Sequence, residues 1–222
     1  MRYKVGMNEH DDDRPLDPAA MLALLEDQQQ DVQRKLARYV PAILLAWGVA
    51  WLFGFGALWA IEGAKPAFAI PLPVSVGIFV GLMVIAVIVS AVAGNRSQRG
   101  IRSSPAARFT GTVYGITGSA GFFAIFVFAA ALDANGMDQQ LMNIYYPSAT
   151  GLFIGLMYII AGAIWHAIPA IWMGAWIGLV ALVAPFFGYP TNYLVFAVAG
   201  GGVFLIGALF MLAYSRGKRA AV

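Results

Sequence analysis

The chain has 222 residues and a formal net charge of +3; 60% of its residues are hydrophobic and 11% are charged. Its mean hydropathy of +0.74 is far from that of a soluble domain, where roughly a quarter of the residues carry charge. The absence of cysteine excludes disulfides, thiolate metal sites and iron–sulfur clusters. We therefore predict an all-α integral membrane protein.

The amino-terminal part differs in composition from the rest of the chain. Residues 1–15 are acidic and polar, which predicts a disordered tail. A cytoplasmic amphipathic helix is expected over 16–39, because Asp17 suits the N-cap and Pro18 the first helical position. Its apolar seam contains Leu22, Leu25, Val32 and Leu36. This seam fits a helix lying on the membrane surface or against the bundle's own loops; the alternative is a docking helix for a protein partner or a second copy.

Six membrane spans are predicted, since each crossing needs about 20 apolar residues. Residues 139–215 are 77 consecutive positions without a charged side chain, which is long enough for three passes. Five spans would result if the fourth and fifth fused, but the basic carboxyl tail would then lie outside. The spans are placed at about 40–61, 74–94, 109–132, 149–168, 170–187 and 193–214.

The positive charges predict the orientation of this 40–214 domain. Basic residues precede the first span, four arginines lie in the loop 95–108, and the tail 215–222 is basic. Lys65 is the one basic residue expected on the opposite side. Because cytoplasmic loops are rich in Lys and Arg, both termini are predicted to be cytoplasmic, in a plasma (inner) membrane. The basic residues serve topology in this interpretation, and no nucleic-acid partner is predicted.

No catalytic, cofactor-binding or metal-binding residue is predicted. The spans contain no charged side chain, which argues against ion-coupled transport. Ser119 lies about 15 Å from the inner end of its helix, whereas His166 lies near the inner end of another span. A base must reach its nucleophile within roughly 3 Å, so a pair like that of rhomboid-type intramembrane serine proteases is not expected. We predict that Ser119 bonds to its own helix and that the protein is not an enzyme.

Two features of the inner half of the bundle suggest binding or gating. An apolar pocket for a hydrophobic small molecule would form if the first and fifth spans are neighbours, lined by Trp47, Trp51, Tyr158, Trp172 and Trp176. Ordinary packing is the other interpretation of these rings. His166 is either an interfacial turn residue or an inner gate, because imidazole changes charge near neutral pH.

Small residues recur four positions apart in several spans. The pairs include Gly77 and Gly81, Gly111 and Gly115, Gly151 and Gly155, and Gly174 and Gly178. Small side chains let helix backbones approach closely in lipid. These pairs fit a tightly packed monomeric bundle or an oligomer interface, and the sequence leaves the oligomeric state open.

The layout of an amphipathic cytoplasmic helix followed by six spans resembles the membrane subunit of ABC-2-type exporters. Two functions follow as expectations. The first is a non-enzymatic accessory, scaffold or regulatory subunit that acts through a protein partner. The second, which the resemblance implies, is a permease or exporter subunit for a hydrophobic small molecule.

Overall fold

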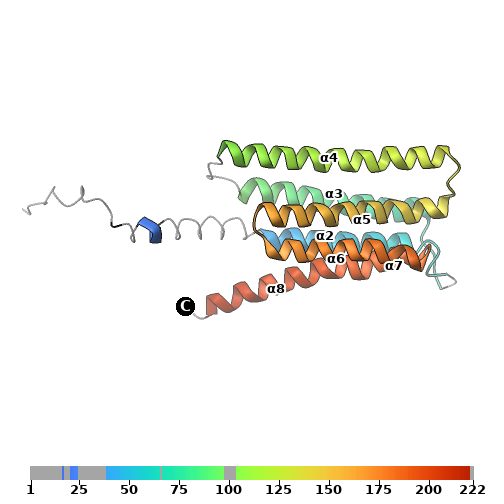
Figure 1. Cartoon of the computed structure of the whole chain (residues 1–222). Helices are drawn as coiled ribbons and strands as arrows, with labels where there is room; N and C mark the ends of the chain where they lie inside the picture. The colour runs from blue at the N-terminus through green and yellow to red at the C-terminus, as the bar shows by residue number, and fades with distance from the viewer. Residues whose placement is uncertain (1–16, 18–20, 25–38, 66, 98–103, 221–222) are drawn as a thin grey trace, which may run out of the picture.

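The computed structural model describes residues 17, 21–24, 39–65, 67–97 and 104–220, and these residues form helices and turns without any strand (Figure 1). Among these residues, six helical segments are long and apolar enough to cross a membrane, in agreement with the six predicted spans, and the predicted all-α fold is confirmed. The first five are α2 (Val40–Trp59), α3 (Leu72–Ser97), α4 (Pro105–Ala134), α5 (Gln139–Ile164) and α6 (Ile168–Val183) with the 3₁₀ turn η1 (Ala184–Phe187).

The sixth segment is irregular. It begins as α7 (Thr191–Val195), passes through one π-helical turn, η2 (Phe196–Gly200), and continues as α8 (Gly201–Ala220). A π turn contains one residue more than an α turn, so it interrupts the regular hydrogen-bond ladder and is found mostly as a single turn within an α-helix.

The fourth span begins at Gln139, whereas the sequence analysis placed its start near residue 149. The carboxylate of Asp138 caps the helix by accepting hydrogen bonds from the backbone N–H of Gln140 at 2.6 Å and of Leu141 at 3.1 Å. The helix then continues through Pro147. Proline cannot donate the helical hydrogen bond, so the helix needs compensation at this point.

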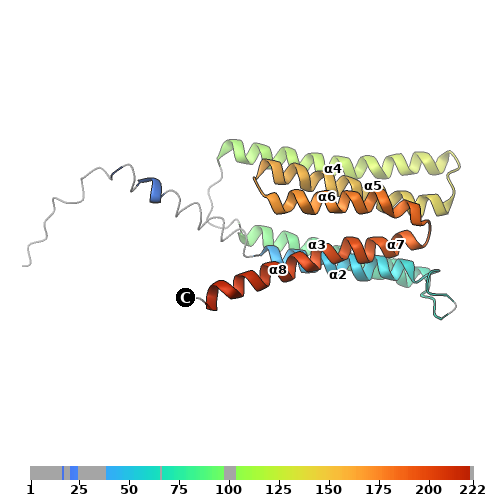
Figure 2. The same cartoon turned by 60° about the horizontal axis from the view of Figure 1, so that its bottom comes forward.

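The helices form two layers of three (Figure 2). One layer contains α3, α2 and α8, with α2 in contact with both neighbours; the other contains α4, α5 and α6, with α5 in contact with both. We call the end of the bundle near Arg96 the Arg96 end, and the opposite end near Asp138 the Asp138 end.

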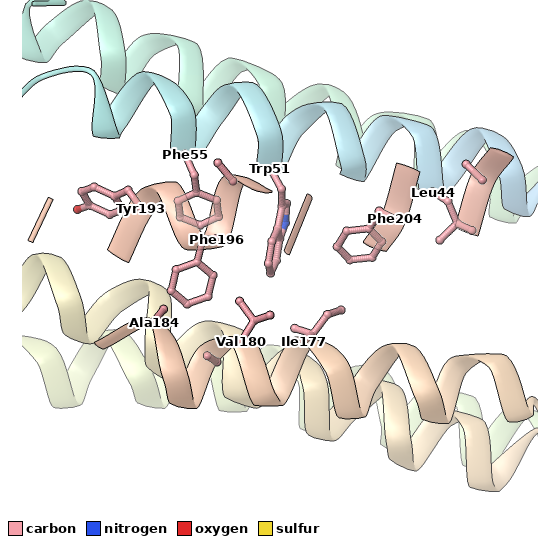
Figure 3. Close-up of a cluster of buried hydrophobic side chains, with 12 residues drawn as sticks. Leu44, Trp51, Phe55, Ile177, Val180, Ala184, Tyr193, Phe196 and Phe204 are labelled. Atoms are coloured by element: carbon pink, nitrogen blue, oxygen red, sulfur yellow. The ribbon is translucent and has the colours of Figure 1, made fainter. Parts of the chain in front are cut away.

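The buried core lies between the layers (Figure 3). Side chains from α2 and from α6 point toward each other, and aromatic rings of the last span fill the space between them. The core residues are Leu44, Trp51, Phe55, Ile177, Val180, Ala181, Ala184, Tyr193, Phe196, Ala197, Phe204 and Ala208. The first and fifth predicted spans therefore share a core through the last span.

The two outer helices contribute little to this core. Of the apolar stretch of α2, 39% is buried in the bundle, compared with 11% for α3 and 6% for α4. Their exposed side chains are mostly apolar, as expected for surfaces that face lipid.

Glycine packing at the α5–α6 crossing generates a stability prediction. A Cβ on Gly155 would lie 2.7 Å from the Gly174 carbonyl oxygen and 2.7 Å from the Gly178 nitrogen, so Gly155→Ala forces two backbones apart. We expect a loss of about 1–3 kcal/mol in unfolding free energy in detergent. Gly111→Ala is the control, because nothing lies within 4 Å of its Cβ position. Equal effects of the two substitutions would contradict the close crossing.

Candidate functional site

Trp51 lies in the centre of the bundle, with only 3% of its surface exposed. Its ring makes edge contacts, with centroid distances of 5.5, 6.1 and 5.4 Å, to Phe55, Phe196 and Phe204 respectively. Aromatic pairs at such distances and angles are favourable beyond the area they bury. Figure 3 shows the indole with Phe55 and Phe196 on one side and Phe204 on the other.

The other pocket residues of the prediction lie on several faces of the bundle. The indole Nε1 of Trp47 donates a hydrogen bond to Ser90 Oγ of α3 at 3.0 Å. Trp172 is 73% exposed. Tyr158 contacts the ring of Phe204 at a centroid distance of 6.4 Å. The structure thus brings Tyr158 and Trp51 onto the same phenylalanine and packs Trp47 against the same core, while Trp172 is largely exposed; the pocket stays a prediction.

Two shallow apolar grooves lie on α4. One, of about 570 Å³, is lined by Gly111, Thr112, Gly115, Ile116, Ser119, Ala120 and Phe123. The other, of about 530 Å³, is lined by Ala124, Ile125, Val127, Phe128, Ala131 and Tyr145. None of the five predicted pocket residues lines either groove.

The π turn of the last span is held from two sides by tryptophans. From α2, the Trp51 ring packs on Gly200, where an added Cβ would lie 2.6 Å from the indole. From α6, the Trp176 Nε1 donates a hydrogen bond to the Ala199 carbonyl oxygen at 3.0 Å. Both layers therefore contact the interrupted turn directly.

Pro147 is a second irregularity, in α5, and side chains again stabilise the backbone around it. Pro147 cannot donate to the Asn143 carbonyl four residues earlier. Instead, the side-chain Nδ2 of Asn192, from α7, donates to that oxygen at 3.1 Å. Thr150 supports the same turn, since its hydroxyl donates to the carbonyl oxygens of Tyr146 at 2.5 Å and of Pro147 at 3.2 Å.

Asn192 is completely buried, and its Oδ1 has no hydrogen-bond partner among the described residues. Burying half an amide without a partner costs free energy. The other half of the amide joins the two layers at the Asp138 end. The sequence analysis did not identify Asn192. Pro147, inside the charge-free stretch, could have indicated that a backbone carbonyl lacks its helical donor and needs one from a side chain.

His166 lies in the turn between α5 and α6, and its side chain is exposed. Its backbone has φ of 53°, the left-handed conformation that commonly ends a helix. The following residue, Ala167, donates its N–H to the Gly162 carbonyl at 2.8 Å, which closes the helix end. The structure thus shows a helix-ending role for the backbone of His166, and the gating role stays a prediction.

The predicted docking seam is described only at its start. Met21–Leu24 are helical and exposed, with Leu22 62% exposed. Leu25, Val32 and Leu36 lie outside the described residues, as does most of the predicted helix over 16–39.

Ser119 is a further polar residue whose predicted role the structure tests. The Ser119 hydroxyl donates to the Gly115 carbonyl oxygen of its own helix at 3.1 Å, as predicted. Within the described ranges, no three His, Cys, Asp or Glu side chains gather as a metal site would require.

In the turn before α7, burial and the nearby Glu62 raise the pKa of the Tyr189 hydroxyl, while Lys65 lowers it; the net shift is upward, so the phenol stays protonated at neutral pH.

These features define a class of protein: a six-span helical bundle whose irregular turns are stabilised by side chains from the other layer. No protein-family model, no curated protein and no solved structure matches the chain.

The role of Asn192 can be tested by a double-mutant cycle. Asn192→Leu leaves the Asn143 carbonyl without a donor and should lower the unfolding free energy by about 1–3 kcal/mol. Pro147→Ala restores the backbone N–H, so the same Asn192 substitution should cost at least about 1 kcal/mol less in that background. Additive effects in reversible unfolding would show that the asparagine does not compensate for the proline.

The conformation of His166 generates another prediction. Glycine adopts a left-handed backbone without strain, so His166→Gly should stabilise the bundle by about 1 kcal/mol. His166→Val, a β-branched control, should destabilise it because valine disfavours positive φ. Thermal unfolding in detergent would measure both. A destabilised glycine variant would instead indicate that the imidazole makes a stabilising contact.

Proposed function

We propose that this protein is a non-enzymatic subunit of a membrane complex, acting as an accessory, scaffold or regulatory component through a protein partner. The observation that carries the proposal is the packing of α4. This helix is 30 residues long, and its main helical neighbour is α5. Most of its surface is therefore available to another membrane helix.

The glycines of α4 divide into two faces. Gly118 and Gly121 face α5, since added Cβ atoms there would meet Met157 at 3.5 Å and the Phe153 ring. Gly111 and Gly115 have nothing within 4 Å of their Cβ positions, and both line the larger groove. In lipid, small residues promote helix association because they permit close van der Waals contact. The uncovered pair therefore supports contact with a partner's transmembrane helix.

The use of the tryptophans also favours a subunit over a permease. A permease for a hydrophobic small molecule needs an accessible cavity beside Trp51. That ring instead packs against three phenylalanines, and Trp47 and Trp176 donate hydrogen bonds to neighbouring helices.

The proposed orientation follows from the charges. The Arg96 end carries the arginine-rich connection between α3 and α4 and the basic carboxyl tail, so we place it in the cytoplasm of a cell with a plasma (inner) membrane. The amphipathic segment 16–39 would then lie on the same side, available as a second docking element.

Co-purification from native membranes tests the proposal. Gly111→Leu with Gly115→Leu fills the uncovered face and should abolish the recovery of at least one specific partner. The control is Gly77→Leu with Gly81→Leu on α3, an equally open pair, which should leave recovery unchanged. Deletion of residues 16–39 tests the second docking element in the same assay.

An unchanged set of co-purifying proteins for both the α4 variant and the deletion would refute the subunit hypothesis. Loss of every partner in the α3 control would also count against it, because the effect would then reflect damage to the bundle. Each variant is first shown to elute from size exclusion in detergent as the parent protein does.

A further inference from the structure

Asn192 holds a buried oxygen that needs a hydrogen-bond donor. The residue is completely buried, and its Nδ2 is fixed by the hydrogen bond of 3.1 Å to the Asn143 carbonyl oxygen. The Oδ1 atom, on the other side of the same amide, has no hydrogen-bond partner among the described residues. A buried amide oxygen without a partner costs free energy, so this atom is a strong site for any donor that can reach it.

Ser148 holds a second oxygen of this kind. Its Oγ is buried and likewise has no partner among the residues that the structure describes. Ser148 lies three residues before Gly151, and helical residues at this spacing share a face. An added Cβ on Gly151 would lie 2.9 Å from the Phe196 ring and 3.1 Å from the Ala181 Cβ. Ser148 therefore lies on the face of α5 that meets the last span and α6.

The backbone of α6 contributes a third oxygen. The N–H of Ala184 donates to the Val180 carbonyl oxygen. The next residue, Pro185, has no N–H to donate to the Ala181 carbonyl oxygen four residues earlier, and the chain continues as the 3₁₀ turn η1. The Ala181 carbonyl therefore lacks its α-helical donor, as happens in α5 at Pro147.

These three oxygens lie at the same level of the bundle. Gly151, Phe196 and Ala181 meet at one point. Ser148 and Asn192 each lie about one helical turn from that point toward the Asp138 end. The carbonyls of α6 point toward the same end, because the helix runs in that direction and helical C=O groups point along the chain. The turn η1 contacts both α5 and α7, which closes the space around the three groups.

We propose that Asn192, Ser148 and Ala181 bind one internal water molecule between α5, α6 and α7. The water would donate its two hydrogens to Asn192 Oδ1 and to the Ala181 carbonyl oxygen, and it would accept the hydroxyl proton of Ser148 in a hydrogen bond. Three hydrogen bonds are typical of buried waters in proteins. Such a water is part of the bundle and does not depend on the partner proposed above.

The chemistry of the three groups favours water over an ion. All three oxygens are neutral, and a cation held in the bundle without a counter-charge would be costly. Two of them, Asn192 Oδ1 and the Ala181 carbonyl, can only accept hydrogen bonds. A bound molecule must therefore supply two donors, which water does.

Nuclear Overhauser spectroscopy between water and the protein tests the site in the unmodified chain. The chain has five asparagines, so labelling asparagine alone with ¹⁵N gives five side-chain amides, and the signal missing from Asn192→Leu identifies Asn192. In detergent micelles we expect a cross peak between water and the Asn192 amide protons, with opposite signs in the laboratory and rotating frames, as for a long-lived bound water. The absence of this cross peak would overturn the proposal.

Ser148→Ala separates a bound water from a hydroxyl that exchanges its proton with the solvent. The cross peak should persist in this variant, because Asn192 Oδ1 and the Ala181 carbonyl still hold the water. Its loss would show that the signal came through the Ser148 hydroxyl, and the water would have to be abandoned.

Unfolding equilibria give an independent measurement. If Ser148 binds the water, Ser148→Ala should raise the unfolding equilibrium constant by about fivefold in the parent and by a clearly smaller factor in Asn192→Leu. The control is Ser75→Ala on α3, which also removes a buried hydroxyl without a partner among the described residues and should have the same effect in both backgrounds. An unchanged or lowered constant for Ser148→Ala in the parent would contradict the site, because the removed hydroxyl would then have had no partner.

A comparison of salts distinguishes water from a cation. The midpoint of thermal unfolding should be the same in sodium chloride and in choline chloride at equal concentration. A higher midpoint in sodium that disappears in Asn192→Leu would place a sodium ion at these oxygens and refute the water.

Discussion

Every backbone N–H and C=O inside a bilayer must find its hydrogen-bond partner within the protein, and this requirement explains the irregular parts of the bundle. Regular helices meet it alone. The fourth span does not, because Pro147 leaves the Asn143 carbonyl without its helical donor. The amide of Asn192 supplies the donor from a different span. The hydrogen bond that Pro147 removes from one helix is thus replaced by a hydrogen bond between the two layers.

The second constraint is the lack of a hydrophobic driving force between helices in lipid. Close approach then depends on small residues at the crossing points. Gly155 and Gly174 bring α5 and α6 together, and Gly200 admits the Trp51 ring. Gly111 and Gly115 have nothing near their Cβ positions, and both also line the larger groove of α4. They are the reason for placing a partner helix on α4.

The two constraints act together between the layers. Among the described residues, Asn192 and Trp176 donate hydrogen bonds to backbone carbonyls across this interface, near the Asp138 end and in the middle of the bundle. Aromatic and aliphatic side chains of the core pack between the layers beside them.

The membrane spans could be predicted from the sequence, whereas the contacts between them could not. A charge-free run of 77 residues and the loop arginines predicted six crossings, because hydropathy is a local property. The pairing of Asn192 with Asn143 joins positions 49 apart, and its detection requires knowing which helices are neighbours. The hydrogen bond from Trp176 to the π turn also depends on which helices are neighbours. The hydrophobic periodicity of the sequence does not predict it.

Hydrogen–deuterium exchange of the chain in lipid nanodiscs, read by mass spectrometry, tests the central claim most directly. The account predicts strong protection throughout the spans, including the turn after Asn143 and the π turn from Phe196 to Gly200. Exchange at those two turns as fast as in the loop between α2 and α3 would contradict it, because their backbone groups would then be open to water and the proposed side-chain donors would be serving no purpose.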